Sequence, residues 1–205
     1  MKFIKWKTLL ITSLVCLAPI LLGVALWDML PDTIAIHFDI NNNPDNFASK
    51  GFVVFVMPAL MVLLQAFCCV VNDINAYKHG ERVKFERAVK WIIPVVTVIL
   101  QFVTLGYAMG WAIDIRRVVA LIVGVVFIVV GNYLPKLDYV KNYDLDTEKA
   151  RKINRFMGFE NVIMGILFIV SIFLSPVATI GCLLLLIPCS IIGVVYGLKV
   201  GRSKE

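Results

Sequence analysis

Residues 30–50 read LPDTIAIHFDINNNPDNFASK and separate two long apolar runs. From Thr33 to Ile40, apolar residues alternate with polar or small ones, which predicts a short strand with one apolar face. Asparagines and a proline follow at residues 41–45, and these residue types favour the backbone conformations of a turn. Ser49 is expected to cap a helix that begins near Gly51, because its hydroxyl can accept a hydrogen bond from a free backbone N–H.

The composition indicates the class of protein. Hydrophobic residues make up 60% of the 205 residues, and the mean hydropathy is +0.87. A soluble core of this size cannot bury so much apolar surface, whereas uncharged runs of about twenty residues match the thickness of a bilayer. We expect an all-α integral membrane protein, a six-helix transmembrane bundle with an ordered outward loop, containing a short β-strand, between the first two helices. The expected spans are Lys7–Leu30, Phe52–Asn72, Trp91–Trp111, Val118–Leu134, Glu160–Leu174 and Val177–Leu198.

The basic N-terminus resembles the start of a signal peptide, but the apolar run that follows is too long and lacks a small-x-small cleavage site. It is therefore interpreted as the first span. The cysteines all lie inside apolar runs and include no C-x-x-C pair, so we expect them to pack as small apolar residues rather than bind metal. They are Cys16, Cys68, Cys69, Cys182 and Cys189.

The distribution of charge predicts the orientation. The net charge is +6, and all but three of the 20 Lys and Arg residues lie before the first span, in alternate loops or in the tail. The exceptions are Lys50, Arg116 and Arg117. The positive-inside rule then places both termini in the cytoplasm and residues 30–50 outside a bacterial cell membrane. The basicity indicates contact with anionic lipids, and we expect no direct binding of nucleic acid.

Few polar residues interrupt the spans. Pro19 should either kink the first span or have its missing N–H compensated by neighbouring groups. Pro94 is expected in the first turn of the third span, where proline is tolerated. Gln65 and Gln101 are the strongly polar residues at depth and are expected to form hydrogen bonds between helices. Because no ionisable group is expected near the middle of a span, a transporter is disfavoured.

The segments between spans are also informative. Residues 73–90 could form a short helix along the lipid headgroups or a solvated basic loop. Arg116 and Arg117 are expected to reach the headgroups or to pair with acids such as Asp114. Residues 146–155 predict a basic helix that leads into the fifth span, with Glu148 and Lys152 on one face.

Two separated motifs resemble the SdpI-like family of membrane immunity proteins. The first is Leu30-Pro31-Asp32 with His37-Phe38 and the polar turn to Ser49-Lys50, and it looks like the family's N-terminal domain of unknown function, DUF1648. The second is similar to a family signature at the inner end of the fourth span and comprises Gly131, Asn132, Tyr133, Leu134, Pro135 and Lys136. The resemblance implies a DUF1648-like unit at residues 1–72 and a four-helix unit at 73–205, together in one compact membrane domain.

The resemblance also implies a function, namely protection of a bacterium against a secreted antimicrobial peptide or toxin, with capture of a cytoplasmic transcriptional repressor in the typical system. The outward loop would bind the toxin, and a basic segment would bind the repressor. The candidate toxin-binding residues are His37, Phe38, Asp39, Asn43, Asp45, Ser49 and Lys50. The candidate repressor-binding residues are Lys149, Arg151, Lys152 and Arg155.

The sequence also bears on two other kinds of site. His37 with Asp32, Asp39 and Asp45 could supply ligands for a divalent metal ion, but a lone outward histidine instead favours a hydrogen bond that fixes the loop. No catalytic motif occurs in the sequence, so we expect neither an enzyme nor a cofactor. The alternative class is a membrane enzyme, or an envelope protein that binds a lipid or small molecule through the outward loop.

Overall fold

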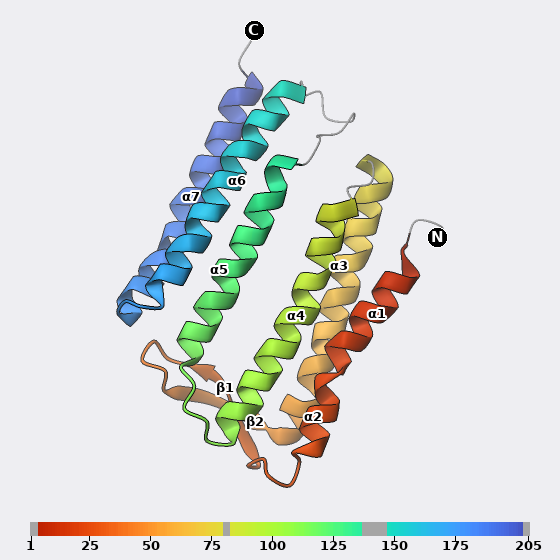
Figure 1. The fold of residues 1–205 in the computed structure, drawn as a ribbon, viewed down its shortest axis with the longest axis vertical. Coiled ribbons are helices and arrows are strands. Elements are labelled where there is room, and N and C mark those ends of the chain that lie inside the picture. Colours follow the sequence, from red (N-terminus) through yellow and green to blue (C-terminus); the bar gives the residue numbers. More distant parts are fainter. Residues whose placement is uncertain (1–3, 80–82, 137–146, 203–205) are drawn as a thin grey trace. The chain divides into compact units, whose positions relative to one another are not determined.

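The computed structural model describes residues 4–79, 83–136 and 147–202 (Figure 1). Within these ranges, six helical spans are long and apolar enough to cross a membrane. The prediction of an all-α, multi-pass membrane protein is confirmed, and so is the strand between the first two spans. The elements are α1 (Trp6–Leu17), α2 (Pro19–Ala25), β1 (Thr33–Phe38), β2 (Pro44–Ser49), η1 (Phe52–Val56), α3 (Met57–His79), α4 (Val83–Ala108), α5 (Ile115–Tyr133), η2 (Leu134–Lys136), α6 (Thr147–Ser171) and α7 (Pro176–Arg202).

The chain forms two compact units, residues 1–115 and 116–205. In the first unit, α1 packs against α3 and α4, and the two strands lie beside the end of α4 (Figure 1). The predicted division after residue 72 follows sequence motifs rather than packing, and it stays a prediction.

Prolines interrupt the helices of the first unit. The predicted kink at Pro19 is confirmed, because α1 ends at Leu17 and Pro19 is the first residue of α2. The expectation for Pro94 was wrong. Since α4 already begins at Val83, Pro94 lies inside the helix and removes one of its backbone hydrogen bonds.

Two buried glutamines replace hydrogen bonds that prolines remove, each acting on the neighbouring helical segment. Pro94 cannot donate to the Lys90 carbonyl four residues earlier, and Gln65 Nε2 of α3 donates to that oxygen at 2.8 Å instead. Pro58, the second residue of α3, likewise cannot donate to the carbonyl of Val53, which lies five residues earlier in the π-helical turn η1. There Gln101 Nε2 of α4 donates at 2.9 Å. The predicted hydrogen bonds of the glutamines between helices are confirmed, and each one replaces a bond lost to a proline on the neighbouring helix.

The two helices on either side of residues 80–82 are longer than expected. Residues 73–79 continue α3 and residues 83–90 belong to α4, so the described part of residues 73–90 is neither a separate headgroup helix nor a solvated loop. Likewise α6 begins at Thr147, and Glu160 lies inside the helix rather than at the start of a span. The expectation that the spans hold no ionisable residue in their interior was therefore wrong.

The second unit contains a close approach of α5 and α6. A Cβ atom on Gly131 would lie 2.7 Å from the Gly158 carbonyl oxygen, and one on Gly165 would lie 2.6 Å from that of Gly124. These two glycine pairs allow the helix backbones to touch, as small residues do at many interfaces between membrane helices. At the start of α5, Arg116 Nη1 donates to Thr179 Oγ1 of α7 at 2.9 Å.

Candidate functional site

The outward loop of the sequence prediction is a β-hairpin. β1 and β2 pair in antiparallel register, with Thr33 opposite Ser49 and Ile34 opposite Ala48, and irregularities interrupt the ladder on either side of His37. Ile34 is buried in an apolar cluster with Val53, Val54 and Leu105, so one face of the hairpin packs on the ends of the helices. The second strand was not predicted, because its sequence PDNFAS lacks apolar alternation.

The turn at the tip of the hairpin is held by Asp39. Its Oδ1 accepts hydrogen bonds from the backbone N–H groups of Asn41 and Asn43 at 2.8 and 2.7 Å, and Oδ2 accepts one from Asn43 Nδ2 at 3.0 Å. The hydrogen bonds from the Asn43 side chain and backbone lower the pKa of the Asp39 carboxyl. Asn42 takes a left-handed conformation with φ of 67°. The predicted turn is confirmed.

Asn42 also fixes the tip to the segment before α5. Its Nδ2 donates to the Ile113 carbonyl at 3.1 Å, and its Oδ1 accepts from the Ile115 backbone N–H at 2.7 Å. Sequence reasoning did not single out Asn42, although asparagine is one of the few residues that tolerate this backbone conformation.

Several of the candidate toxin-binding residues anchor the hairpin, Lys50 and Ser49 at its base and Phe38 near its tip. Lys50 Nζ lies 3.1 Å from Asp32 Oδ1 and 5.2 Å from the ring centroid of Trp27. Ser49 Oγ accepts a hydrogen bond from the Phe52 backbone N–H at 3.3 Å, which confirms the predicted capping contact. Phe38 packs edge-to-face on Tyr107 of α4, with the ring centroids 4.8 Å apart. Toxin binding by these residues stays a prediction.

The outer surface of the hairpin carries an exposed histidine–carboxylate contact and an exposed aromatic ring. His37 Nδ1 contacts Asp45 Oδ1, and their side chains are 68% and 46% exposed. The expected hydrogen bond of His37 is confirmed, and its partner is a carboxylate. Phe47 is 53% exposed, although no prediction included it. No group of three His, Cys, Asp or Glu side chains that could hold a metal ion occurs in residues 4–79, 83–136 and 147–202.

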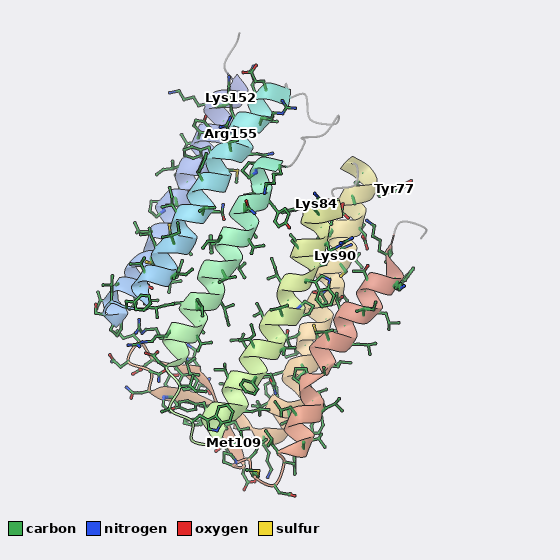
Figure 2. All side chains as sticks on the ribbon, viewed as in Figure 1. Tyr77, Lys84, Lys90, Met109, Lys152 and Arg155 are labelled. Atoms are coloured by element: carbon green, nitrogen blue, oxygen red, sulfur yellow. The ribbon has the colours of Figure 1, made fainter. Side chains whose placement is uncertain are left out.

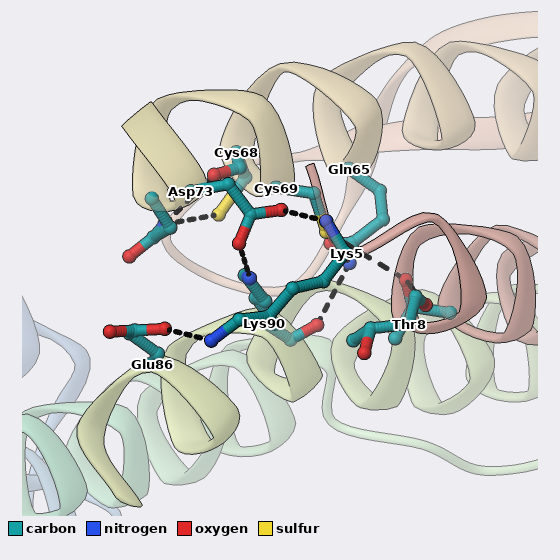
Figure 3. A network of polar contacts seen from close by, with 10 residues as sticks. Lys5, Thr8, Gln65, Cys68, Cys69, Asp73, Glu86 and Lys90 are labelled. Carbon is teal, nitrogen blue, oxygen red and sulfur yellow. Dashed lines mark hydrogen bonds and ion pairs between the residues drawn. The ribbon is translucent and has the colours of Figure 1, made fainter. Parts of the chain in front are cut away.

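A buried charge network joins α1, α3 and α4 at the other end of the first unit (Figures 2 and 3). Lys90 Nζ contacts Asp73 Oδ1, and both side chains are almost fully buried. Asp73 Oδ2 accepts the Lys5 backbone N–H at 3.0 Å, and Lys5 Nζ lies 3.0 Å from Glu86 Oε2. Sequence reasoning missed this network, because it treated these charges as solvated.

A polar seam continues from the network into the membrane span. Gln65 Nε2 donates to Cys69 Sγ at 3.2 Å, and Thr12 Oγ1 lies 3.9 Å from the same sulfur. Gln65 Oε1 accepts no hydrogen bond from the described part of the chain. Cys16 and Cys69 are fully buried, as expected for packing residues.

The second sequence motif, residues 131–136, packs the end of α5 against α6. Gly131 and Pro135 both pack closely against Gly158. A Cβ atom added to Gly158 would lie 2.8 Å from the Gly131 carbonyl oxygen and 2.6 Å from Pro135 Cγ. Lys136 Nζ donates to Asn132 Oδ1 at 3.0 Å and lies 5.6 Å from the ring centroid of Tyr133. The motif therefore has a structural role in the second unit.

The candidate repressor-binding residues lie in the first turns of α6. Arg151, Lys152 and Arg155 are exposed, and Lys149 is partly buried. Figure 2 labels Lys152 and Arg155 on this part of α6. Lys152 Nζ lies 2.9 Å from Glu148 Oε1, which confirms the predicted pairing on one helix face. Repressor binding is not tested by these contacts and stays a prediction.

Comparisons with known proteins agree with the sequence motifs. The family described as "Domain of unknown function (DUF1648)" matches residues 14–62, a range that contains the whole hairpin. The immunity protein SdpI of Bacillus subtilis (strain 168) is 27% identical over 126 residues, which make up 62% of this chain and 58% of SdpI. No solved structure matches the chain. The chain is therefore a membrane protein with a DUF1648 region that contains the hairpin, and it is similar to SdpI over part of its length.

Proposed function

We propose that this protein is a membrane immunity protein that protects a bacterial cell against a secreted peptide toxin. The hairpin is its recognition element. The observation that carries this proposal is the exposed surface formed by His37, Asp45 and Phe47 on an otherwise well-anchored hairpin. The similarity to SdpI supports a binding rather than a catalytic role.

The anchoring of the hairpin favours recognition. The contacts of Asp39, Asn42 and Lys50 fix the tip and the base before any partner arrives. A preorganised surface loses less conformational entropy on binding, and exposed aromatic rings often dominate the energy of an interface. Phe47 would supply apolar contact, and the neighbouring His37 and Asp45 side chains would supply polar contact.

The orientation and charge of the hairpin suit a cationic peptide. The positive-inside rule places the hairpin on the outer face, where a secreted toxin arrives. Residues 28–50 contain Asp28, Asp32, Asp39 and Asp45 against Lys50 as the single lysine. This acidic excess would attract a basic peptide to the hairpin.

Resistance assays test the recognition role. Cells that express His37→Ala, Asp45→Ala or Phe47→Ala at the level of the unchanged protein should lose resistance to a toxin selected from a panel of membrane-active peptides. Phe159→Ala is the matched control, because Phe159 is a similarly exposed aromatic residue on α6. Full resistance in all three hairpin variants would refute this role of the hairpin.

A second candidate function is capture of a cytoplasmic repressor, and the exposed basic residues at the start of α6 favour it. Arg151→Glu with Arg155→Glu should alter expression of a reporter controlled by the protein's own promoter and leave resistance unchanged. Unaltered reporter expression would count against repressor capture. The alternative class, an enzyme or lipid-binding protein, predicts instead that the purified protein retains zinc or a lipid.

A further inference from the structure

Glu160 has an unusual position in the second unit. It lies near the middle of α6, within the membrane span Glu148–Ser171. The described part of the chain provides no hydrogen bond or ion pair to its carboxyl group, which is half-buried. Because hydrocarbon solvates an ionised carboxylate poorly, a carboxyl group at this depth normally has a partner or a function.

The side chain faces the seam between α6 and α7. A Cβ atom on Gly193 of α7 would lie 3.0 Å from Glu160 Oε2, so this buried glycine leaves the space that the carboxyl group occupies. On one side of this position Phe156 stacks on Tyr196, with ring centroids 4.3 Å apart. On the other side Cys189 Sγ lies 3.7 Å from Met164 Sδ. Apolar contacts therefore flank the carboxyl group along the seam.

The charged and titratable neighbours do not neutralise Glu160. From α7, the titratable groups near it are the Cys189 thiol and the Tyr196 phenol, and neither is a cation. On α6, Arg155 is five residues away and therefore projects about 140° around the helix from Glu160. On α5, Gly131 packs against Gly158 and Asn161 of α6, and it has no side chain that could carry a charge.

We propose that Glu160 is a proton-binding site within the α6–α7 seam. The carboxylate takes up one proton, an O–H bond forms on its carboxyl oxygen beside Gly193, and no electron is transferred. The resulting neutral carboxyl group can remain in apolar surroundings without a cation. The site lies outside the hairpin and is independent of the proposed toxin recognition.

Dicyclohexylcarbodiimide tests the proposal, because this apolar reagent enters membranes and reacts with protonated carboxyl groups. The full-length protein in its native membrane would be treated at neutral pH, and adducts would be located by peptide mass spectrometry. Glu160 should react at least about tenfold faster than Glu148, a carboxylate that pairs with Lys152 at the end of the same helix.

Variants of two glycines on α7 show whether labelling of Glu160 depends on the space beside its carboxyl group or only on entry of the reagent into the membrane. Gly193→Ala would place a methyl group against the carboxyl oxygen and should reduce labelling of Glu160 several-fold. Gly181→Ala is the control, because nothing lies within 4 Å of its added Cβ atom. Labelling of Glu160 no faster than that of Glu148 would overturn the proposal, and so would equal labelling in the two glycine variants. Glu160→Gln should fold and lose the adduct.

Discussion

Asp73 has a buried carboxylate on which two other groups depend. Lys90 Nζ contacts one oxygen, and the Lys5 backbone N–H donates to the other. Breaking a buried ion pair leaves an uncompensated charge, whereas replacing both partners by apolar groups of similar size is often tolerated. The network is therefore expected to respond very differently to single and double substitutions.

Asp73→Ala should destabilise the protein by about 3–5 kcal/mol, because Lys90 would stay buried without its counterion. Asp73→Leu combined with Lys90→Met should recover most of that loss. Unfolding in mixed micelles would measure both effects. Lys152→Ala is the control, since its pair with Glu148 is exposed and should contribute about 0–1 kcal/mol. Equal destabilisation by the single and double substitutions would contradict the argument.

The hairpin tip should loosen in acid. Because hydrogen bonds from Asn43 lower the pKa of Asp39 in the folded hairpin, this carboxylate stabilises the tip above its unfolded pKa. That contribution is lost as the pH falls through the lower folded pKa. The backbone amide resonances of Asn41 and Asn43 should therefore shift together in strongly acidic solution, as followed by NMR. Asp39→Asn should abolish this shift, and an unchanged titration in that variant would rule out Asp39 as its cause.

At the scale of elements, prolines and glutamines determine how α3 and α4 fit together. The Gln65 amide donates to the carbonyl that Pro94 leaves free, and the Gln101 amide does the same for the carbonyl that Pro58 leaves free. Each broken helix therefore depends on its neighbour for one hydrogen bond. This arrangement fixes the register of the two helices, because a shift along the axis would lose both bonds.

Gln65→Leu should cost about 1–3 kcal/mol, since the Lys90 carbonyl would lose its donor in a buried site. Adding Pro94→Ala should recover much of this loss, because alanine restores the backbone N–H that can donate to that carbonyl. The free energies of unfolding of the two single variants and the double variant provide the measurement. If the changes in unfolding free energy of the two single variants simply add up in the double variant, Gln65 does not compensate for Pro94.

The elements also show what sequence patterns could and could not predict. Apolar runs predicted the spans, and the alternation from Thr33 to Ile40 predicted β1, because both signals arise from local burial. β2 was missed since its pairing with β1, rather than its own pattern, makes it a strand. The ends of α3 and α4 were missed because Asp73 and Lys90 read as solvated charges, and only their pairing explains their burial.

At the scale of the whole molecule, topology links the fold to the proposed function. Toxin recognition requires the hairpin on the outer face, and repressor capture requires the start of α6 on the inner face. The sequence predicted a hydrogen bond from His37 to a nearby group, but it did not identify Asp45 as the partner. It also missed Phe47, whose exposure depends on which face of the hairpin packs against the helices.

Cysteine labelling in intact cells tests the topology. In a variant with all native cysteines replaced by alanine or serine, Asn46→Cys on the hairpin should react with a membrane-impermeant maleimide. Lys152→Cys on α6 should react only after the cells are opened. Both positions are exposed, so accessibility within the protein is matched. The reverse pattern would invert the proposed orientation.

The buried ion pair also bears on how the protein enters the membrane during synthesis. Asp73 lies in α3 and is made before Lys90 of α4, so for a short time its carboxylate lacks Lys90 as its counterion. Transfer of α3 alone into lipid would carry an unpaired acid, which is unfavourable. The pairing therefore favours release of α3 and α4 from the translocon together, as a helical hairpin that is already neutralised.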